Sequence, residues 1–257
     1  MKKLKFIITL IIGFCVLSCS SDDDPIINDG LKLFKKVVLY KNGLFMEKII
    51  NYNSDNKIET IVINKYNGAG APYKNLITVN YSNNYVSSIT DAFDYEHSYF
   101  TDDEITYDVS SDNNLITLTS NEIVIEIAHS NGYVDSIIKY YINNPSNFND
   151  SFLTRDKNQN LISIVFHNGN IVNTYSGFDS DKKPDPDGIV VDIQHRDYLN
   201  ILGLKLTANN PGISSQSILG SPGVNQNYTY EYDDQGYITR TYEQNRNFYT
   251  DTFYLED

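Results

Sequence analysis

Residues Tyr228–Tyr242 read YTYEYDDQGYITRTY, and this stretch predicts the fold of the whole chain. Tyrosine and threonine alternate with polar residues on both sides of an Asp-Asp-Gln-Gly corner. This alternation is typical of a β-hairpin, because successive side chains of a strand point to opposite faces. The return strand carries Ile238 and Thr241 three residues apart. Weaker copies of the same unit occur upstream.

These weaker copies share an apolar strand, a corner rich in Asn, Asp and Ser, and an apolar return strand. Their return strands are anchored at Ile58, Val86, Leu115, Val134 and Leu161. The gaps between the anchors are unequal, which indicates hairpins of different length rather than a tight solenoid. No helical segment separates the hairpins. We therefore expect an all-β fold, an antiparallel meander of repeated hairpins that forms a twisted open sheet or an incomplete barrel.

Residues 1–18 predict an export signal. Three lysines precede an apolar run over residues 6–17, which is too short to span a bilayer of roughly 30 Å. The sequence Val16-Leu17-Ser18-Cys19 resembles the bacterial lipobox. This resemblance implies that the sulfur of Cys19 carries a diacylglycerol, and that Cys19 becomes the mature N-terminus and a membrane anchor. The alternative is an ordinary signal peptide in which Cys19 has no role.

Residues 19–30 predict an acidic, disordered tether in front of a single β domain at residues 31–257. Within the tether, Ser20-Ser21-Asp22-Asp23-Asp24-Pro25 resembles the export tag of surface-exposed lipoproteins of the Bacteroidetes. A solvated linker that carries no export information has the same composition, and the two interpretations are compatible. The resemblance implies a lipid-anchored protein of the cell envelope, in the outer membrane and exposed at the surface.

The composition excludes several classes of function. The two cysteines, Cys15 and Cys19, both lie at the export signal, so the β domain has no disulfide, zinc–thiolate site or cysteine nucleophile. The formal net charge is −13; without the three lysines of the signal, seventeen basic residues face 33 acidic ones, a balance of −16. Such a field repels nucleic acid and anionic membrane surfaces. Divalent cations and neutral sugars remain open as partners.

A family resemblance rests on Tyr230–Thr239, which reads YEYDDQGYIT. It resembles the YD repeat of bacterial wall-associated and Rhs-type proteins, whose repeats form a β-rich shell with no catalytic residue of their own. The upstream hairpins keep the geometry but lack the Asp or the Gly. Together with the lipobox and the acidic tag, these degenerate hairpins are similar to uncharacterised Bacteroidetes surface lipoproteins. That similarity implies a fold and a location, and no established chemistry.

A loop-rich insertion at residues 176–223 interrupts the hairpins. Apolar residues at 198, 199, 201 and 202, followed by Gly203, predict at most one short helix near 197–203.

Four aspartates in the insertion form a candidate calcium site, because Ca²⁺ binds carboxylates on flexible loops. They are Asp179, Asp181, Asp185 and Asp187. Lys182-Lys183-Pro184 interrupts the array, and no distal Glu completes an EF-hand. A solvated turn is the favoured interpretation, so we expect no cofactor, with calcium as the one candidate.

No motif supports a catalytic mechanism. The four histidines are dispersed, and neither a His-Glu-x-x-His nor a Gly-x-Ser-x-Gly motif occurs. Carboxylates such as Asp102-Asp103-Glu104, or Glu243 with Asp251, would serve a hydrolase only if they lie roughly 5 to 9.5 Å apart. The 21 tyrosines could stack on sugars, but Trp is absent. Cross-strand packing is their favoured role.

These observations predict a non-enzymatic binding or scaffolding protein of the envelope, whose ligand is a glycan or another envelope protein. The alternative is a hydrolase that acts on polysaccharide through a carboxylate pair. Enzymatic activity stays open, and the lack of a motif favours its absence.

We expect Cys19→Ala to release the protein from membranes, because the sulfur that would carry the lipid is lost. Immunoblots of membrane and soluble fractions measure the release. Cys15→Ala, inside the apolar run, is the matched control and should leave the distribution unchanged. An unchanged membrane fraction for Cys19→Ala would contradict the lipid anchor.

Overall fold

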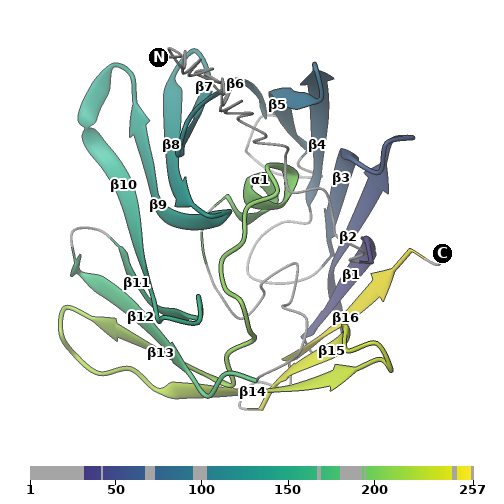
Figure 1. The fold of residues 1–257 in the computed structure, drawn as a ribbon, viewed down its shortest axis with the longest axis vertical. Coiled ribbons are helices and arrows are strands. Elements are labelled where there is room, and N and C mark those ends of the chain that lie inside the picture. The colour runs from purple at the N-terminus through teal and green to yellow at the C-terminus, as the bar shows by residue number, and fades with distance from the viewer. Residues whose placement is uncertain are drawn as a thin grey trace, which may run out of the picture.

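The computed structural model describes residues 32–41, 43–66, 73–94, 103–166, 169–179, 193, 195–244 and 248–255. Within these ranges, sixteen strands form a closed antiparallel barrel around one short helix (Figure 1). The first eight strands are β1 (Phe34–Lys41), β2 (Leu44–Tyr52), β3 (Ile58–Lys65), β4 (Tyr73–Ser82), β5 (Tyr85–Asp94), β6 (Asp103–Asp112), β7 (Leu115–Thr119) and β8 (Ile123–Ser130). The remaining elements are β9 (Tyr133–Tyr141), β10 (Asn144–Arg155), β11 (Leu161–Phe166), β12 (Ile171–Ser176), α1 (Arg196–Ile201), β13 (Ile213–Ile218), β14 (Asn225–Tyr232), β15 (Ile238–Glu243) and β16 (Phe248–Tyr254).

The barrel is closed because its first and last strands pair with each other. The β1–β16 register runs from Phe34 opposite Tyr254 to Lys41 opposite Phe248. Our expectation of an open sheet or incomplete barrel was therefore wrong. Closure gives partners to two sheet edges that would otherwise expose unpaired backbone groups. It joins residues from the two ends of the chain, so no local sequence pattern marks it. The antiparallel meander and the single short helix, which are local features, are confirmed.

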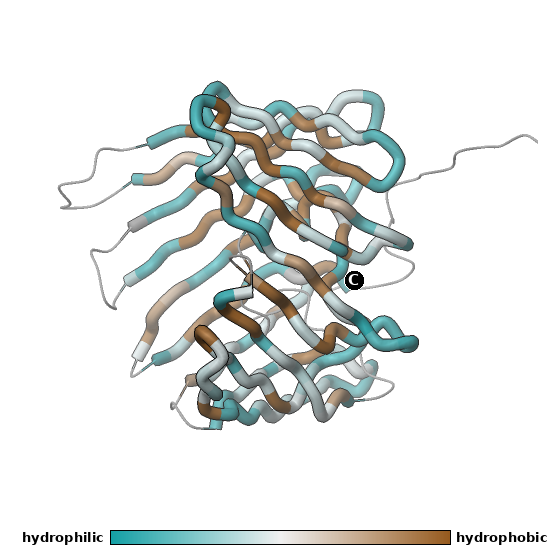
Figure 2. The backbone as a smooth tube through the Cα atoms, turned by 90° about the vertical axis from the view of Figure 1, so that its left-hand side faces the viewer, coloured by the Kyte–Doolittle hydropathy of each residue, from teal (hydrophilic) through white to brown (hydrophobic). Residues whose placement is uncertain are grey.

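The strands place mostly apolar rows inside the barrel and both polar and apolar rows outside. Across β3 to β6, the residues Thr60, Thr78, Thr90 and Thr106 stand opposite one another in an outward row. The adjacent inward row begins with Ile61 and Ile77, which are 0% and 2% exposed. Figure 2 shows the resulting alternation of hydrophobic and hydrophilic segments along the strands. A second outward row, Ile49, Val62, Leu76 and Ala92, is apolar, so the outer face of this part of the barrel carries both polar and apolar rows.

Because the sheet is a meander, its connections alternate between two rims. The turn rim carries the short connections after β2, β4, β6, β8, β10 and β14, and also the ends where β1 starts and β16 stops. The loop rim carries the connections after β1, β3, β5, β7, β9, β11, β13 and β15.

Three corners on the turn rim share one geometry, built on Asn53, Asp156 and Asp233. In each, the side-chain oxygen accepts the backbone N–H groups two and four positions later, at 2.8–3.0 Å. The residue three positions later has a positive φ, which at Gly236 is 83°. The return strands then begin with buried Ile58, Leu161 and Ile238. The hairpin at Tyr228–Tyr242 is thus one of three with the same corner.

The insertion between β12 and β13 carries α1 into the barrel interior (Figure 1). The helix ends as expected at Gly203, whose φ of 70° is left-handed. Its N–H donates to Asn200 O at 3.2 Å, and the N–H of Leu204 donates to Leu199 O at 2.9 Å. This pair of bonds is a Schellman motif. No helix in the described part of the chain combines the length and the hydrophobicity needed to cross a membrane.

After α1, the chain runs along the turn rim and binds its corners. The N–H of Lys205 donates to Gly132 O at 2.8 Å, between β8 and β9. The N–H of Leu161 donates to Thr207 Oγ1 at 3.1 Å, and Tyr230 OH donates to Pro211 O at 2.6 Å. These bonds reach three separate hairpins, so this segment ties the turn rim together from inside.

We expect Asp156→Ala to lower the free energy of unfolding by about 1–2 kcal/mol, because two turn N–H groups lose their acceptor. For a domain of this size that is a fall in melting temperature of roughly 2–8 °C. Asp156→Asn should retain the acceptor, as Asn53 does in its own corner, and melt close to the wild type. Asp55→Ala, at an exposed turn position, is the neutral control. Equal losses in Asp156→Ala and Asp156→Asn would show that the corner geometry does not depend on this acceptor.

Candidate functional site

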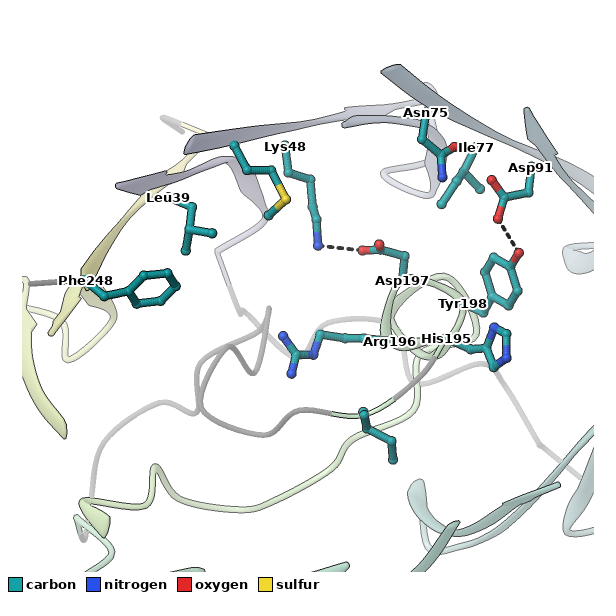
Figure 3. Close-up of a pocket in the computed structure, with 12 residues that line it drawn as sticks. Leu39, Lys48, Asn75, Ile77, Asp91, His195, Arg196, Asp197, Tyr198 and Phe248 are labelled. Carbon is teal, nitrogen blue, oxygen red and sulfur yellow. Dashed lines mark hydrogen bonds and ion pairs between the residues drawn. The ribbon is translucent and has the colours of Figure 1, made fainter. Parts of the chain in front are cut away.

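A cavity of about 430 Å³ lies between α1 and the inner wall of the barrel (Figure 3). Leu39, Met46 and Phe248 line it close to the loop-rim ends of β1, β2 and β16. The cavity therefore lies in the half of the barrel nearer the loop rim. Its full lining is Leu39, Met46, Lys48, Asn75, Ile77, Asp91, Ile193, His195, Arg196, Asp197, Tyr198 and Phe248.

An ion pair fixes α1 to the wall. Lys48 Nζ lies 2.7 Å from Asp197 Oδ1, and the Lys48 side chain is only 5% exposed. Lys48 occupies an inward position of β2, between Met46 and Ile50 on the same face. A buried pair of this kind is costly to break from one side, at roughly 3–5 kcal/mol, because the remaining charge stays in a poorly solvated place.

A second polar contact ties α1 to β5. Tyr198 OH donates a hydrogen bond to Asp91 Oδ2, and Asp91 is 9% exposed. Burial raises the pKa of Asp91; hydrogen bonds from Tyr198 and Asn75 oppose the rise, and the negative charge of Asp197 adds to it. Burial also raises the pKa of the Tyr198 hydroxyl, and the charge of Asp91 acts in the same direction. The hydroxyl therefore stays a donor, and the carboxyl oxygen its acceptor.

His195 begins the helix in a strained conformation. Its φ of 60° and ψ of 25° are left-handed, and its ring stacks on Tyr198 with centroids 5.3 Å apart. Burial lowers the pKa of His195 to about 4, and the positive charge of Lys139 adds to the shift. The imidazole is therefore neutral at pH 7, and its buried Nε2 has no hydrogen-bond partner among the described residues.

Arg196 points from α1 toward the cavity (Figure 3). Its Nε is buried without a hydrogen-bond acceptor among the described residues. The cavity thus combines a cation, neutral and ionic polar groups and apolar walls. Such a mixture is typical of small-molecule sites, which are mostly apolar with a few convergent polar groups.

The predicted calcium site falls mostly outside the described residues. Only Asp179 is described, and its carboxylate accepts hydrogen bonds from Asn210 N at 2.9 Å and from Tyr232 OH. Asp181, Asp185 and Asp187 lie outside the described residues, as does Cys19. Where side chains are described, no group of three or more His, Cys, Asp or Glu residues is arranged to hold a metal ion.

The carboxylate pair named from the sequence is separated by the sheet. Glu243 stands opposite Phe248, whereas Asp251 stands opposite Arg240, three positions earlier in β15. Residues 240 and 243 are three positions apart in β15, and side chains alternate between the faces of a strand, so the carboxylates of Asp251 and Glu243 lie on opposite faces of the sheet. Arg240 Nη2 donates to Asp251 Oδ2 at 2.9 Å, so Asp251 is an ion-pair partner on the outer face. Asp103 and Glu104, adjacent in β6, also point to opposite faces, and Asp102 is outside the described residues.

The residues that form the cavity were not singled out from the sequence. Lys48 and Asp91 are charged residues at inward strand positions, and this interruption of an apolar row is the signal that could have found them. Their partners on α1 follow 149 and 107 residues later. The sequence predicted the helix that contributes Asp197 and Tyr198, but their partners Lys48 and Asp91 are brought to the helix only by the folding of the barrel.

We expect His195→Asn to weaken the acid sensitivity of the fold. In the unfolded chain His195 takes up a proton as the pH falls below about 6.5, whereas in the folded protein it stays neutral down to about pH 4. The free energy of unfolding therefore decreases as the pH is lowered from 6.5 to 4. Asn tolerates the left-handed φ and does not titrate. Urea unfolding between pH 7 and 4 should give a smaller fall for this variant, whatever its stability at pH 7. His129→Asn, at the β8–β9 turn, should retain the wild-type fall. Equal falls in all three proteins would contradict a buried neutral His195.

Comparisons with known proteins concern the fold alone. No family model matches this sequence, and no curated protein has significant sequence similarity to it. A porin-like protein from Bacteroides vulgatus ATCC 8482 is similar in structure over 88% of this chain and 100% of its own, with 13% identity and a TM-score of 0.49. A porin-like protein from Bacteroides uniformis ATCC 8492 is similar over 86% and 98%, with 12% identity and a TM-score of 0.41.

Proposed function

We propose that this chain is a lipid-anchored envelope protein of the non-enzymatic binding type, which holds a small ligand in the cavity beside α1. The observation that carries the proposal is the cavity itself. Its volume of about 430 Å³ lies within the range of small-molecule sites, roughly 300–1,000 Å³. Charged and apolar side chains converge on it from five strands and the helix.

The location is part of the proposal. The export signal and the lipobox-like Cys19 favour the outer membrane, with surface exposure following from the resemblance of the acidic tag. We therefore propose that the lipid on Cys19 holds the barrel to the membrane.

The tether would reach the barrel at the turn rim. The N–H of Lys32 donates to Tyr237 OH at 3.0 Å, and Lys32 Nζ lies 2.9 Å from Asp233 Oδ2. The corner of the Tyr228–Tyr242 hairpin thus holds the start of the described chain. The cavity lies in the other half of the barrel, so the ligand site would be on the side away from the membrane anchor.

Binding is favoured over the alternative of a polysaccharide hydrolase. The pair Glu243 and Asp251 is divided between two faces of the sheet. The two carboxylates that do share the cavity are engaged, Asp91 by Tyr198 and Asp197 by Lys48. A glycan fragment remains a candidate ligand. The resemblance of Tyr230–Thr239 to the YD repeat supports a structural role for this hairpin and implies no catalytic chemistry.

The absence of tryptophan from the sequence allows a direct test. Phe248→Trp places a single tryptophan in the cavity wall, and Phe253→Trp places one on the outer face, where Phe253 is 48% exposed; excitation at the red edge selects tryptophan over the 21 tyrosines. Each variant is titrated with neutral sugars, sugar acids, amino acids and short fatty acids. We expect at least one class to change the emission of Phe248→Trp with saturation, and to leave Phe253→Trp unchanged.

Two results would count against the proposal. If no class changes the emission of Phe248→Trp, the cavity is not a site for these small molecules. If both variants respond alike, the binding is on the surface rather than in the cavity.

A further inference from the structure

Arg196 differs from the other arginines in the described part of the chain. Arg155 Nη1 lies 3.2 Å from Asp135 Oδ1, and Arg240 binds both carboxylate oxygens of Asp251. Arg196 lines the cavity, and no described carboxylate lies within ion-pair distance of it. Its Nε is buried and has no described acceptor. A guanidinium in such a place favours a planar anion that accepts two parallel hydrogen bonds.

The nearest cation does not share this property. Lys48 is paired with Asp197 at 2.7 Å, and that pair lies between the helix and the wall (Figure 3). Two cations, Lys48 and Arg196, and two carboxylates, Asp91 and Asp197, line the cavity. Asp197 pairs with Lys48 and Asp91 accepts from Tyr198, so Arg196 is the cavity cation without a described carboxylate partner. The guanidinium of Arg196 would attract an anion locally, whereas the net charge of −13 repels anions from most of the remaining surface.

On the β4–β5 wall, the cavity presents acceptors instead of donors. Asn75 and Asp91 are 5% and 9% exposed, and Oδ1 of each is buried without a described donor. Asp91 stands opposite Ile77 in the sheet, and Asn75 is two positions before Ile77, so the two side chains share the inner face of the β4–β5 wall and line one side of the cavity. Buried acceptors of this kind are costly unless a donor reaches them. Hydroxyl groups of a ligand would be suitable donors.

The remaining wall is apolar. Leu39 and Phe248 lie on the other side of the Lys48–Asp197 pair from Asn75 and Asp91 (Figure 3). A flat ring with C–H groups on its face packs well against Leu39 and the ring of Phe248. Arg196, the Asn75–Asp91 wall and the apolar wall would thus be complemented by a carboxylate, hydroxyl groups and an apolar face in one small molecule.

We propose, building on the function proposed above, that the cavity takes a sugar acid of the uronic type, with its carboxylate on Arg196. The hydroxyl groups donate to Asn75 and Asp91, and one face of the ring packs on Phe248. A neutral sugar would leave Arg196 without an anion. A fatty acid would leave the two buried oxygens without donors.

The test is calorimetric titration of the purified full-length protein with galacturonate, galactose and hexanoate. Galactose has the ring and hydroxyl groups without the carboxylate, and hexanoate has the carboxylate without hydroxyl groups. We expect galacturonate to bind about tenfold or more tightly than either, because a charge-assisted hydrogen-bond pair is lost with galactose. Arg196→Gln should lose about tenfold or more in galacturonate affinity. Arg240→Gln removes the same charge on the outer face and should bind as the wild type.

A second measurement does not depend on the folding of a variant. Phenylglyoxal modifies arginine side chains, and mass spectrometry identifies the modified positions in the wild-type protein. Galacturonate should protect Arg196 and leave Arg240 as reactive as before, whereas galactose should protect neither. Protection of Arg196 that is equal with both sugars, or absent with galacturonate, would overturn the role of Arg196.

The outcomes separate this inference from the proposed function. If another class of molecule changes the emission of Phe248→Trp while galacturonate does not bind, the cavity is a binding site and the sugar-acid inference is wrong. If galactose binds as tightly as galacturonate, the carboxylate requirement is wrong while a glycan site remains. If no molecule reaches the cavity, both proposals fall.

Discussion

The pairing of β1 with β16 closes the sheet, and the width of the closed barrel constrains the rest of the structure. A barrel of about eight strands is filled by its own inward side chains, whereas one of sixteen or more encloses a space too wide for them. Here sixteen strands surround that space, and the insertion between β12 and β13 returns into it with α1. Tyr198, Leu199 and Ile201 of the helix complete the apolar core. The cavity lies beside the helix, between α1 and the inner face of the strands.

Polar contacts decide where the helix sits in that space. Apolar packing alone is non-directional, so it would allow a six-residue helix several positions in a wide barrel. Lys48–Asp197 and Asp91–Tyr198 join two successive helix residues to β2 and β5. Each of these groups would be costly to bury without its partner. The same two contacts that fix the helix also shape the cavity and leave Arg196 directed into it.

The two rims of the barrel differ in their contacts, because the hydrogen-bonded corners lie at one rim and the cavity lies toward the other. On the turn rim, Asn53, Asp156 and Asp233 hold corners of the same geometry, and the segment after α1 bonds to the Asp156 corner, to the β8–β9 turn and to Tyr230 of β14. The start of the described chain also bonds to this rim, at Asp233 and Tyr237. The cavity lies toward the loop rim, where the connections are mostly outside the described residues. A hydrogen-bonded rim at the start of the described chain and a cavity in the opposite half fit the proposal that the protein binds a molecule away from a lipid anchor.

The sequence by itself determined the local features. Alternation with period two predicted the strands, Asx residues predicted the corners, and the spacing of Tyr198 and Leu199 before Gly203 predicted the helix and its end. These follow from backbone sterics and short-range hydrogen bonds, which act within a few residues. Only the tertiary structure decided closure, because Phe34 meets Tyr254 across the length of the chain. It also decided the site, since Lys48 and Asp91 gain their partners on α1 only once the barrel has brought strand and helix together.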